Sequence, residues 1–185
     1  MKEIRLHGRG GMGTVKASEI IVYANIAKGG YGNSIPFFGF ERQGAPVTAF
    51  VKIDTKPIRP KTQVYNPDCI VIMDPTIRKA VDVYEGIKED AVLVINTVEK
   101  IEELKVPPQV RKVAMIDATS LALKRIGKII TNTAMLGAFV KGTEWVELDD
   151  VVEKVREFWG DVNADIVKEA YEQTVVYDLD RETGR

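Results

Sequence analysis

Apolar residues recur along this chain with two different periods, and the alternation between them predicts strands followed by helices. A short strand is expected at residues 4–7, ended by a glycine-rich turn. A helix should follow from about Thr14, and Gly29 and Gly30 should stop it. Residues 47–53 alternate between apolar and polar, which predicts a strand with one packed face, placed antiparallel to its neighbours.

Three nearly continuous apolar runs predict strands that are covered on both faces. They span residues 69–73, 91–95 and 113–116. Short helical or irregular crossovers are expected at 75–84 and 101–104, and the proline-bearing stretch 55–67 is expected to be a loop. Cys69 opens the first run and is interpreted as a small buried strand residue.

After Asp117 the period becomes helical, and four helices are expected, at 120–126, 134–140, 149–159 and 163–177. The second is apolar nearly all round, which indicates burial. The caps predicted for the last three are Thr133, Asp149 or Asp150, and Asn163. The fold class is therefore α/β, a three-layer, mostly parallel or mixed sheet with helices on both faces, in one domain over 1–185.

Composition narrows the range of functions. The 185 residues carry a formal net charge of -1 with 29% charged residues, so no basic footprint for nucleic acid is present. One cysteine and one histidine exclude a Cys₄ iron–sulfur cluster and a structural zinc site on this chain alone. No apolar run reaches the roughly 20 residues that a membrane span needs, so a cytoplasmic protein without membrane contact is expected.

The glycine loop after the first strand is the main candidate site. Gly8, Gly10 and Gly13 match G-x-G-x-x-G, with Gly11 as a fourth glycine, between a strand and a helix. Backbone N–H groups and a helix N-terminus favour a phosphate or carboxylate there. Residues 28–34 lack the acid that a dinucleotide ribose requires, which disfavours NAD. A close turn at a subunit contact remains the alternative.

Charged and polar residues near this loop extend the candidate list. Arg9 lies inside the loop and is expected to reach a phosphate, a carboxylate or a partner's acid. Lys16 reads as an ordinary solvated residue, and His7 as either a hydrogen-bonding neighbour or a strand end. Glu41 and Arg42 stand on a constrained turn, where an interface or anion-binding role is favoured over turn stabilisation.

Four segments together resemble the γ family of 2-oxoacid:ferredoxin oxidoreductases, and they follow the family order over almost the whole chain. Where the family commonly carries Gln, this chain has Met12. For Asn132 two roles remain open, a helix cap and an interface residue. The four segments span residues 7–13 (HGRGGMG), 40–47 (FERQGAPV), 132–138 (NTAMLGA), and 163–164 with 170–171 (NA and AY).

The resemblance implies a subunit that performs no complete chemistry alone. Such enzymes convert a 2-oxoacid, with pyruvate favoured here, and coenzyme A into acyl-CoA and CO₂, and they pass electrons to ferredoxin. Thiamine diphosphate and iron–sulfur clusters are implied on the α, β and δ subunits, and no cofactor is expected to be held firmly by this chain. The glycine loop and Arg42 would face coenzyme A phosphates, and Glu41, Arg42 and Asn132 would face partner subunits.

Three hypotheses follow. The chain completes the active-site cleft of the complex, or it is a non-catalytic assembly subunit. The third, a stand-alone nucleotide-dependent oxidoreductase, is disfavoured by the missing ribose acid.

Overall fold

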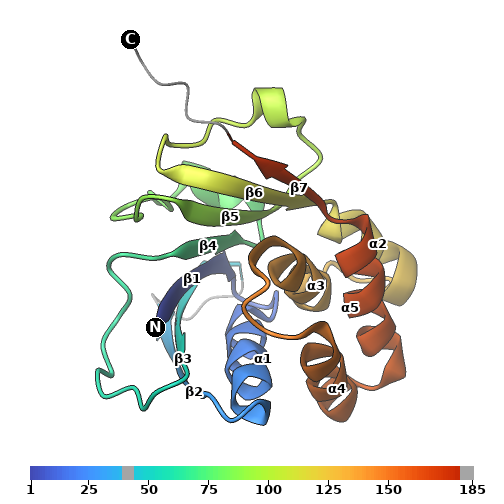
Figure 1. The fold of residues 1–185 in the computed structure, drawn as a ribbon. Helices are drawn as coiled ribbons and strands as arrows, with labels where there is room; N and C mark the ends of the chain where they lie inside the picture. The colour runs from blue at the N-terminus through green and yellow to red at the C-terminus, as the bar shows by residue number, and fades with distance from the viewer. Residues whose placement is uncertain (39–43, 180–185) are drawn as a thin grey trace.

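Residues 1–38 and 44–179, which the computed structural model describes, form a seven-stranded mixed sheet with five α-helices (Figure 1). The strand order is β2-β3-β1-β4-β5-β6-β7. The strands are β1 (Lys2–Arg9), β2 (Tyr31–Phe38), β3 (Pro46–Asp54), β4 (Cys69–Ile72), β5 (Ala91–Asn96), β6 (Val110–Ile116) and β7 (Val175–Asp178). The helices are α1 (Thr14–Ala27), α2 (Ala118–Ile126), α3 (Asn132–Thr143), α4 (Leu148–Trp159) and α5 (Asp161–Gln173), with 3₁₀-helices η1 (Pro75–Lys79) and η2 (Ile101–Glu103).

Strand direction divides the sheet into a parallel centre and antiparallel margins. β1, β4, β5 and β6 pair in parallel, whereas β3 runs antiparallel to β1 and to β2, and β7 runs antiparallel to β6. The mixed α/β sheet is as predicted, and so is the antiparallel direction of the strand around Val47. Because the four central strands are parallel, their carboxyl ends meet at one edge of the sheet.

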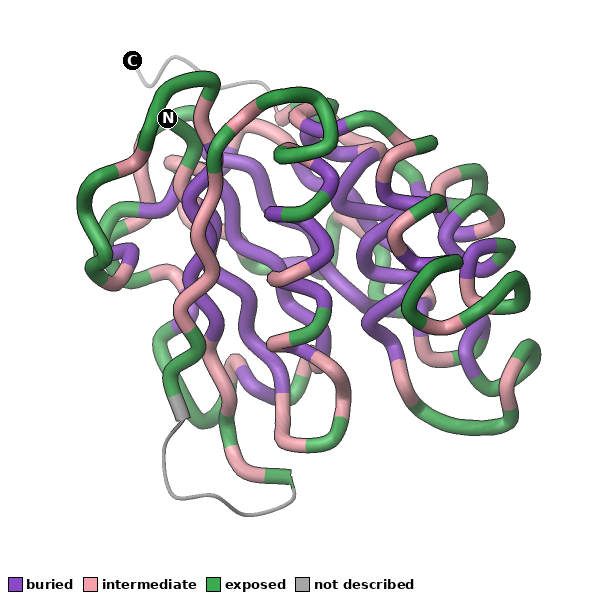
Figure 2. Tube along the Cα trace, turned by 90° about the horizontal axis from the view of Figure 1, so that it is seen from below, coloured by how far each residue is buried: buried purple, intermediate pink, exposed green. Residues whose placement is uncertain are grey.

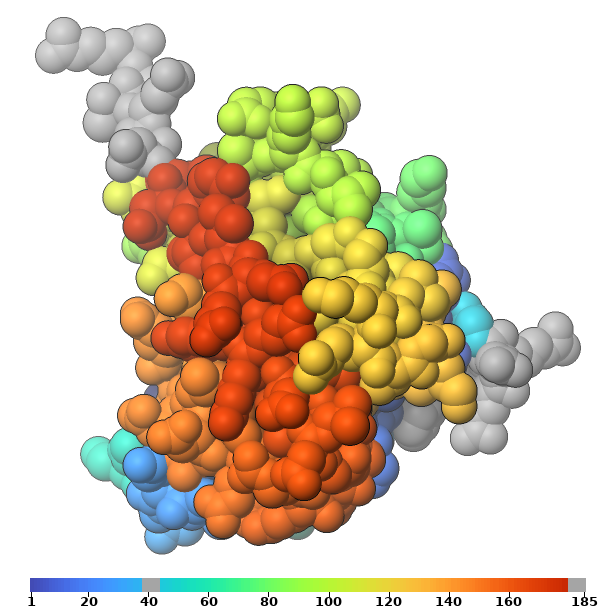
Figure 3. All heavy atoms as spheres, turned by 90° about the vertical axis from the view of Figure 1, so that its right-hand side faces the viewer, coloured from blue at the N-terminus to red at the C-terminus, as the bar shows by residue number. Residues whose placement is uncertain are grey.

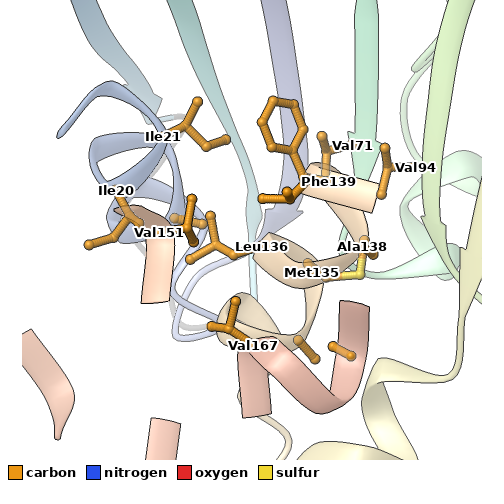
Figure 4. Close-up of a cluster of buried hydrophobic side chains, with 14 of the residues drawn as sticks. Ile20, Ile21, Val71, Val94, Met135, Leu136, Ala138, Phe139, Val151 and Val167 are labelled. Carbon is orange, nitrogen blue, oxygen red and sulfur yellow. The ribbon is translucent and has the colours of Figure 1, made fainter. Parts of the chain in front are cut away.

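The main core lies between the sheet and the α-helices. Ile4 and Leu6 of β1 point into it, while Arg5 and His7, which alternate with them, point to the opposite face, as the period of a strand requires. α3 is buried nearly all round, as its sequence predicted, and its Phe139 packs beside strand and helix residues in Figure 4.

The helical layer has an inner and an outer part. α2, α4 and α5 form the outer surface of this layer (Figure 3). In Figure 2 the buried segments are mainly the inner strands of the sheet and the helix turns that face them.

The opposite face has a different cover. Behind β4, β5 and β6 a second apolar cluster joins strand residues such as Ile72 and Leu93 to Ile77 of η1 and Leu104 after η2. The sequence predicted helices on both faces of the sheet. One face carries the α-helices, and the other carries short 3₁₀-helices and loops. Behind β1, β2 and β3 this face carries both polar and aromatic side chains, among them Arg5, Thr48 and Phe50.

Two strands were missed by the sequence prediction. No element was predicted over β2, because its positions toward α1 are Gly32, Ser34 and Pro36 rather than large apolar residues. Ser34 and Ser18 of α1 hydrogen-bond at 2.7 Å, and the small residues let α1 approach. β7 was predicted to be the end of the last helix, although its β-branched sequence Val175-Val176-Tyr177 favours a strand.

All three predicted helix caps are wrong. Asp149 and Asp150 lie in the first turn of α4, after Glu147 as the N-cap. Asn163 lies inside α5 and donates to the Trp159 carbonyl oxygen, and α3 begins at Asn132, one residue before Thr133. The acidic pair still favours the start of α4 through the helix dipole.

Candidate functional site

The candidate site lies where β1 and β4 end side by side. After β1 the chain turns through the glycine loop into α1 and continues to β2 and β3, whereas after β4 it passes through η1 to β5 on the other side. The two connections therefore diverge at this edge of the sheet (Figure 1). Parallel α/β sheets bind ligands at such a point, where the direction of strand order reverses.

The glycines of the loop are required by close contacts and by backbone conformation. A Cβ on Gly8 would lie 2.2 Å from Thr14 Oγ1. Gly13 has a φ of 79°, in the left-handed region, and a Cβ there would lie 2.5 Å from Asn132 Nδ2. The turn is therefore tight because α1 and α3 both pack onto it.

Backbone hydrogen bonds fix the loop against the segment before β3. The Gly10 amide donates to the Ala45 carbonyl oxygen at 2.9 Å, and the Gly44 amide donates to the Gly10 carbonyl oxygen at 3.2 Å. Within the loop the Met12 amide donates to the Arg9 carbonyl oxygen at 3.1 Å. The Gly10 amide is thus already used and is not available to an anion.

The donors that remain lie at the start of α1. Gly13 is the N-cap and supplies no side-chain cap, and the first intrahelical bond runs from the Ala17 amide to the Gly13 carbonyl oxygen. The amides of the first turn have no intrahelical acceptor, because none precedes them. Thr14 Oγ1 is buried and has no hydrogen-bond partner among the described residues. These groups together suit an anion with several acceptor oxygens.

Arg9 joins the two loops of the site. Its Nε donates to Asp74 Oδ2 at 2.6 Å, its Nη1 to the Gly44 carbonyl oxygen at 3.0 Å and its Nη2 to Thr76 Oγ1 at 2.9 Å. Burial alone would raise the pKa of Asp74, but hydrogen bonds from Thr76 and Arg9 outweigh it and lower that pKa. The guanidinium charge is therefore balanced within the chain, and Arg9 acts first as a positioning residue.

Asn132 is placed against the glycine loop by the start of α3. Its side chain is 6% exposed, and its Oδ1 accepts from the Thr133 amide at 2.9 Å. The preceding Thr131 donates through Oγ1 to the Met73 carbonyl oxygen at 3.4 Å, just after β4. The Asn-Thr-Ala-Met-Leu-Gly segment thus supports the loop from within, and an interface role for Asn132 stays a prediction.

Asn96, at the end of β5, was not singled out by the sequence. Its Nδ2 donates to the Met73 carbonyl oxygen and to Thr119 Oγ1, both at 2.9 Å. Its Oδ1 accepts from the amides of Ala118 and Thr119 at the start of α2. A lone Asn closing an apolar run was the available signal, since side-chain amides favour such ends.

His7 and Lys16 differ sharply in their surroundings. Burial, followed by the charge of Arg5, lowers the pKa of His7 to about 3, so its imidazole is neutral at physiological pH. Neither His7 nitrogen has a hydrogen-bond partner in the described part of the chain. Lys16 pairs with Glu19 at 2.8 Å on the exposed side of α1, as expected of a solvated residue.

Several predicted features remain outside the site or outside the structure. Glu41 and Arg42 lie beyond the described residues, and their roles stay predictions. Cys69 is fully buried, and that burial raises the pKa of its thiol well above the usual range, as a structural cysteine requires. Across 1–38 and 44–179 there is no metal-binding group of three His, Cys, Asp or Glu side chains. The same ranges contain no helix long and apolar enough to cross a bilayer.

Comparisons with known proteins agree with this geometry over nearly the full length. A family model described as pyruvate ferredoxin/flavodoxin oxidoreductase matches residues 3–173. The "Pyruvate/ketoisovalerate oxidoreductases common subunit gamma" of Pyrococcus furiosus is 45% identical, covering 97% of this chain and 100% of the relative. "Pyruvate synthase subunit PorC" of Methanothermobacter marburgensis is 44% identical, covering 94% and 97%.

A solved structure shares the fold as well. The pyruvate oxidoreductase subunit PORC of Thermotoga maritima superposes with a TM-score of 0.80 at 32% identity, covering 96% of this chain and 98% of that one. The mixed sheet and the helical layer are therefore features that this chain shares with a separate subunit of an oxidoreductase.

Proposed function

The chain belongs to the pyruvate ferredoxin/flavodoxin oxidoreductase family, as a subunit of a multi-subunit 2-oxoacid oxidoreductase, and we propose that it presents an anion-binding edge to its partners. The ligand is a phosphate group of coenzyme A, held by the first-turn amides of α1 and by Thr14 Oγ1. The observation that carries the proposal is the buried Thr14 hydroxyl without a partner, beside an uncapped helix start at the point where the strand order reverses.

The division of labour follows from what this chain lacks. One cysteine cannot hold an iron–sulfur cluster, so the electron carriers belong to partner subunits of the α, β and δ types, which pass electrons to ferredoxin. Thiamine diphosphate, also on partner subunits, supplies the carbanion chemistry of decarboxylation. The residues of this chain bind and orient coenzyme A, whose thiol accepts the acyl group. The ion pair of Arg9 with Asp74 holds the two loops of the site together.

Pyruvate is the proposed substrate of the complex, and its selection is assigned to other subunits. The Pyrococcus furiosus relative is named as common to pyruvate and ketoisovalerate oxidoreductases. A subunit shared in this way cannot carry the pocket that separates the two substrates. This supports a role for the present chain in the step that both reactions have in common, the transfer of the acyl group to coenzyme A.

The test compares Thr14→Val with the wild type in the assembled enzyme. Valine keeps the shape of threonine but removes the hydroxyl, so the apparent KM for coenzyme A should rise about tenfold, the value of one hydrogen bond to a charged group. The apparent KM for the 2-oxoacid should stay unchanged. Lys16→Ala, two residues further along α1 on its exposed side, is the matched control and should alter neither constant.

Two other outcomes would decide for the competing functions. If Thr14→Val and Arg9→Ala weaken assembly while turnover per intact complex and both KM values persist, the chain is an assembly subunit. If the isolated chain binds NAD(P) in a titration and turns over a substrate, it is a stand-alone oxidoreductase. Either result would contradict the proposed role in binding coenzyme A.

A further inference from the structure

A second pocket lies on the sheet face opposite the α-helices. It encloses about 500 Å³ between β1, β2, β3 and the loops at residues 63–66 and 81–86. That volume falls in the range of small-molecule sites, which are concave and carry a few convergent polar groups. The glycine loop does not contribute to its lining.

The floor of this pocket is formed by two alternate residues of β1, Arg5 and His7, whose side chains face away from the core. Arg5 is 7% exposed and His7 is 5% exposed. Arg5 Nη2 donates to the carbonyl oxygens of Val83 and Glu85, at 3.0 and 2.5 Å, which holds the guanidinium against the 81–86 loop. Its Nε has no acceptor among the described residues.

His7 adds a second unsatisfied group to the floor. Both ring nitrogens are buried and unpartnered in the described ranges, although a neutral imidazole offers one donor and one acceptor. Buried polar groups in folded proteins nearly always have partners, so these three atoms beside one pocket offer hydrogen-bonding capacity to a bound molecule. A ligand that satisfies all three must bring acceptors for Arg5 Nε and for one His7 nitrogen, and a donor for the other.

The walls favour a flat molecule. Phe37 of β2 and Phe50 of β3 flank the floor with ring centroids 6.5 Å apart and an interplanar angle of 54°. Phe37 is 52% exposed, and Tyr65 on the facing loop is also exposed. Exposed aromatic side chains at a pocket mouth provide stacking area for a ring.

The charges around the pocket favour a neutral molecule. Arg5 contributes the positive charge, and Asp82 and Glu85, which also line the pocket and act on Arg5 electrostatically, contribute two negative charges. An anion would meet this acidic rim, and a cation would meet Arg5 at the floor. We propose that this pocket binds a small, neutral, flat molecule whose carboxamide-like edge meets Arg5 and His7 while its ring lies against Phe37 and Phe50.

The test uses three probes of one shape and different charge: benzamide, benzoate and benzamidine. His7 is the single histidine of the chain, so its imidazole signals in NMR spectra of the full chain need no assignment. Benzamide should shift them saturably with a Kd on the order of a millimolar, as befits so small a molecule. Benzoate and benzamidine should bind about tenfold more weakly.

Two variants of matched exposure locate the binding. Phe37→Ala should weaken benzamide binding several-fold, whereas Phe158→Ala, which removes an equally exposed ring (51%) from α4, should leave it unchanged. Arg5→Lys, which keeps the charge but removes Nε, should also weaken it. The proposal is overturned if benzoate or benzamidine binds more tightly than benzamide, if no probe moves the His7 signals, or if both phenylalanine variants behave alike.

Discussion

Arg9 Nε lies 2.6 Å from Asp74 Oδ2, so the loop that follows β1 is joined to the loop that follows β4. The same carboxylate accepts from the amide and hydroxyl of Thr76 through its other oxygen, at 2.8 and 2.7 Å. The pair therefore closes the site at the point where the two connections diverge. An anion arriving there would meet a guanidinium already engaged, and would depend on the donors of α1.

This relationship predicts non-additive effects of Arg9→Ala and Asp74→Ala. Each single change should lower the free energy of unfolding by about 1–2 kcal/mol, because a partly buried, charge-assisted hydrogen bond is lost. The double variant should be scarcely less stable than either single one, since the pair acts as a unit. Urea unfolding of the four proteins measures this cycle, and fully additive losses would show that the two residues stabilise the fold independently.

Gly13 should tolerate alanine less well than Gly29, although both have nearly the same φ. Their φ values are 79° and 78°, so a Cβ costs each about 1–2 kcal/mol of left-handed strain. Only at Gly13 does the Cβ also meet Asn132, whereas nothing lies within 4 Å at Gly29. Gly13→Ala should therefore melt several degrees lower than Gly29→Ala in calorimetry. Equal melting temperatures would mean that Asn132 moves aside without cost.

The sequence predicted the elements whose apolar pattern repeats and missed those whose partners are distant. β4 and β5 are buried on both faces, so their residue content alone identifies them. β2 carries small residues where α1 presses against it, and no period reveals a strand whose packing depends on a neighbouring helix. Thr174 alone separates α5 from β7, so the prediction extended the helix over residues that form the strand.

The same limit applies to the candidate site. The glycine loop was visible because strand, glycines and helix are contiguous in sequence. Asp74 lies 65 residues from Arg9, so nothing local indicated that the arginine already has a carboxylate. His7 likewise showed no sign of its burial, since its environment is built by loops more than fifty residues away.

The buried His7 predicts a pH-dependent term in stability. Its pKa is about 3 in the folded chain and 6.5 in an unfolded one, so the unfolded state binds more protons between these values. The free energy of unfolding should therefore fall with decreasing pH by about 1.4 kcal/mol per unit, beginning near pH 6.5. Urea unfolding at pH 4.5–8 should show this slope in the wild type and lose it in His7→Gln. Parallel curves for the two proteins would place the imidazole in contact with solvent.

Asn96 should be sensitive to a change of one atom. In Asn96→Asp the acceptor for the α2 amides remains, but the donor to the Met73 carbonyl oxygen and to Thr119 is lost at neutral pH. The buried Met73 carbonyl oxygen then faces a carboxylate without a donor, which should cost about 2–3 kcal/mol of unfolding free energy. Because burial favours the protonated acid, which again donates, the deficit should shrink as pH falls.

Asn25→Asp is the matched control for this substitution. Asn25 also donates to two carbonyl oxygens, but nearer the surface. Water can replace the lost donor there, so the deficit should stay below about 1 kcal/mol. An equal loss of stability in Asn96→Asp and Asn25→Asp would contradict the prediction, because it would show that the burial of Asn96 does not increase the cost of losing its donor.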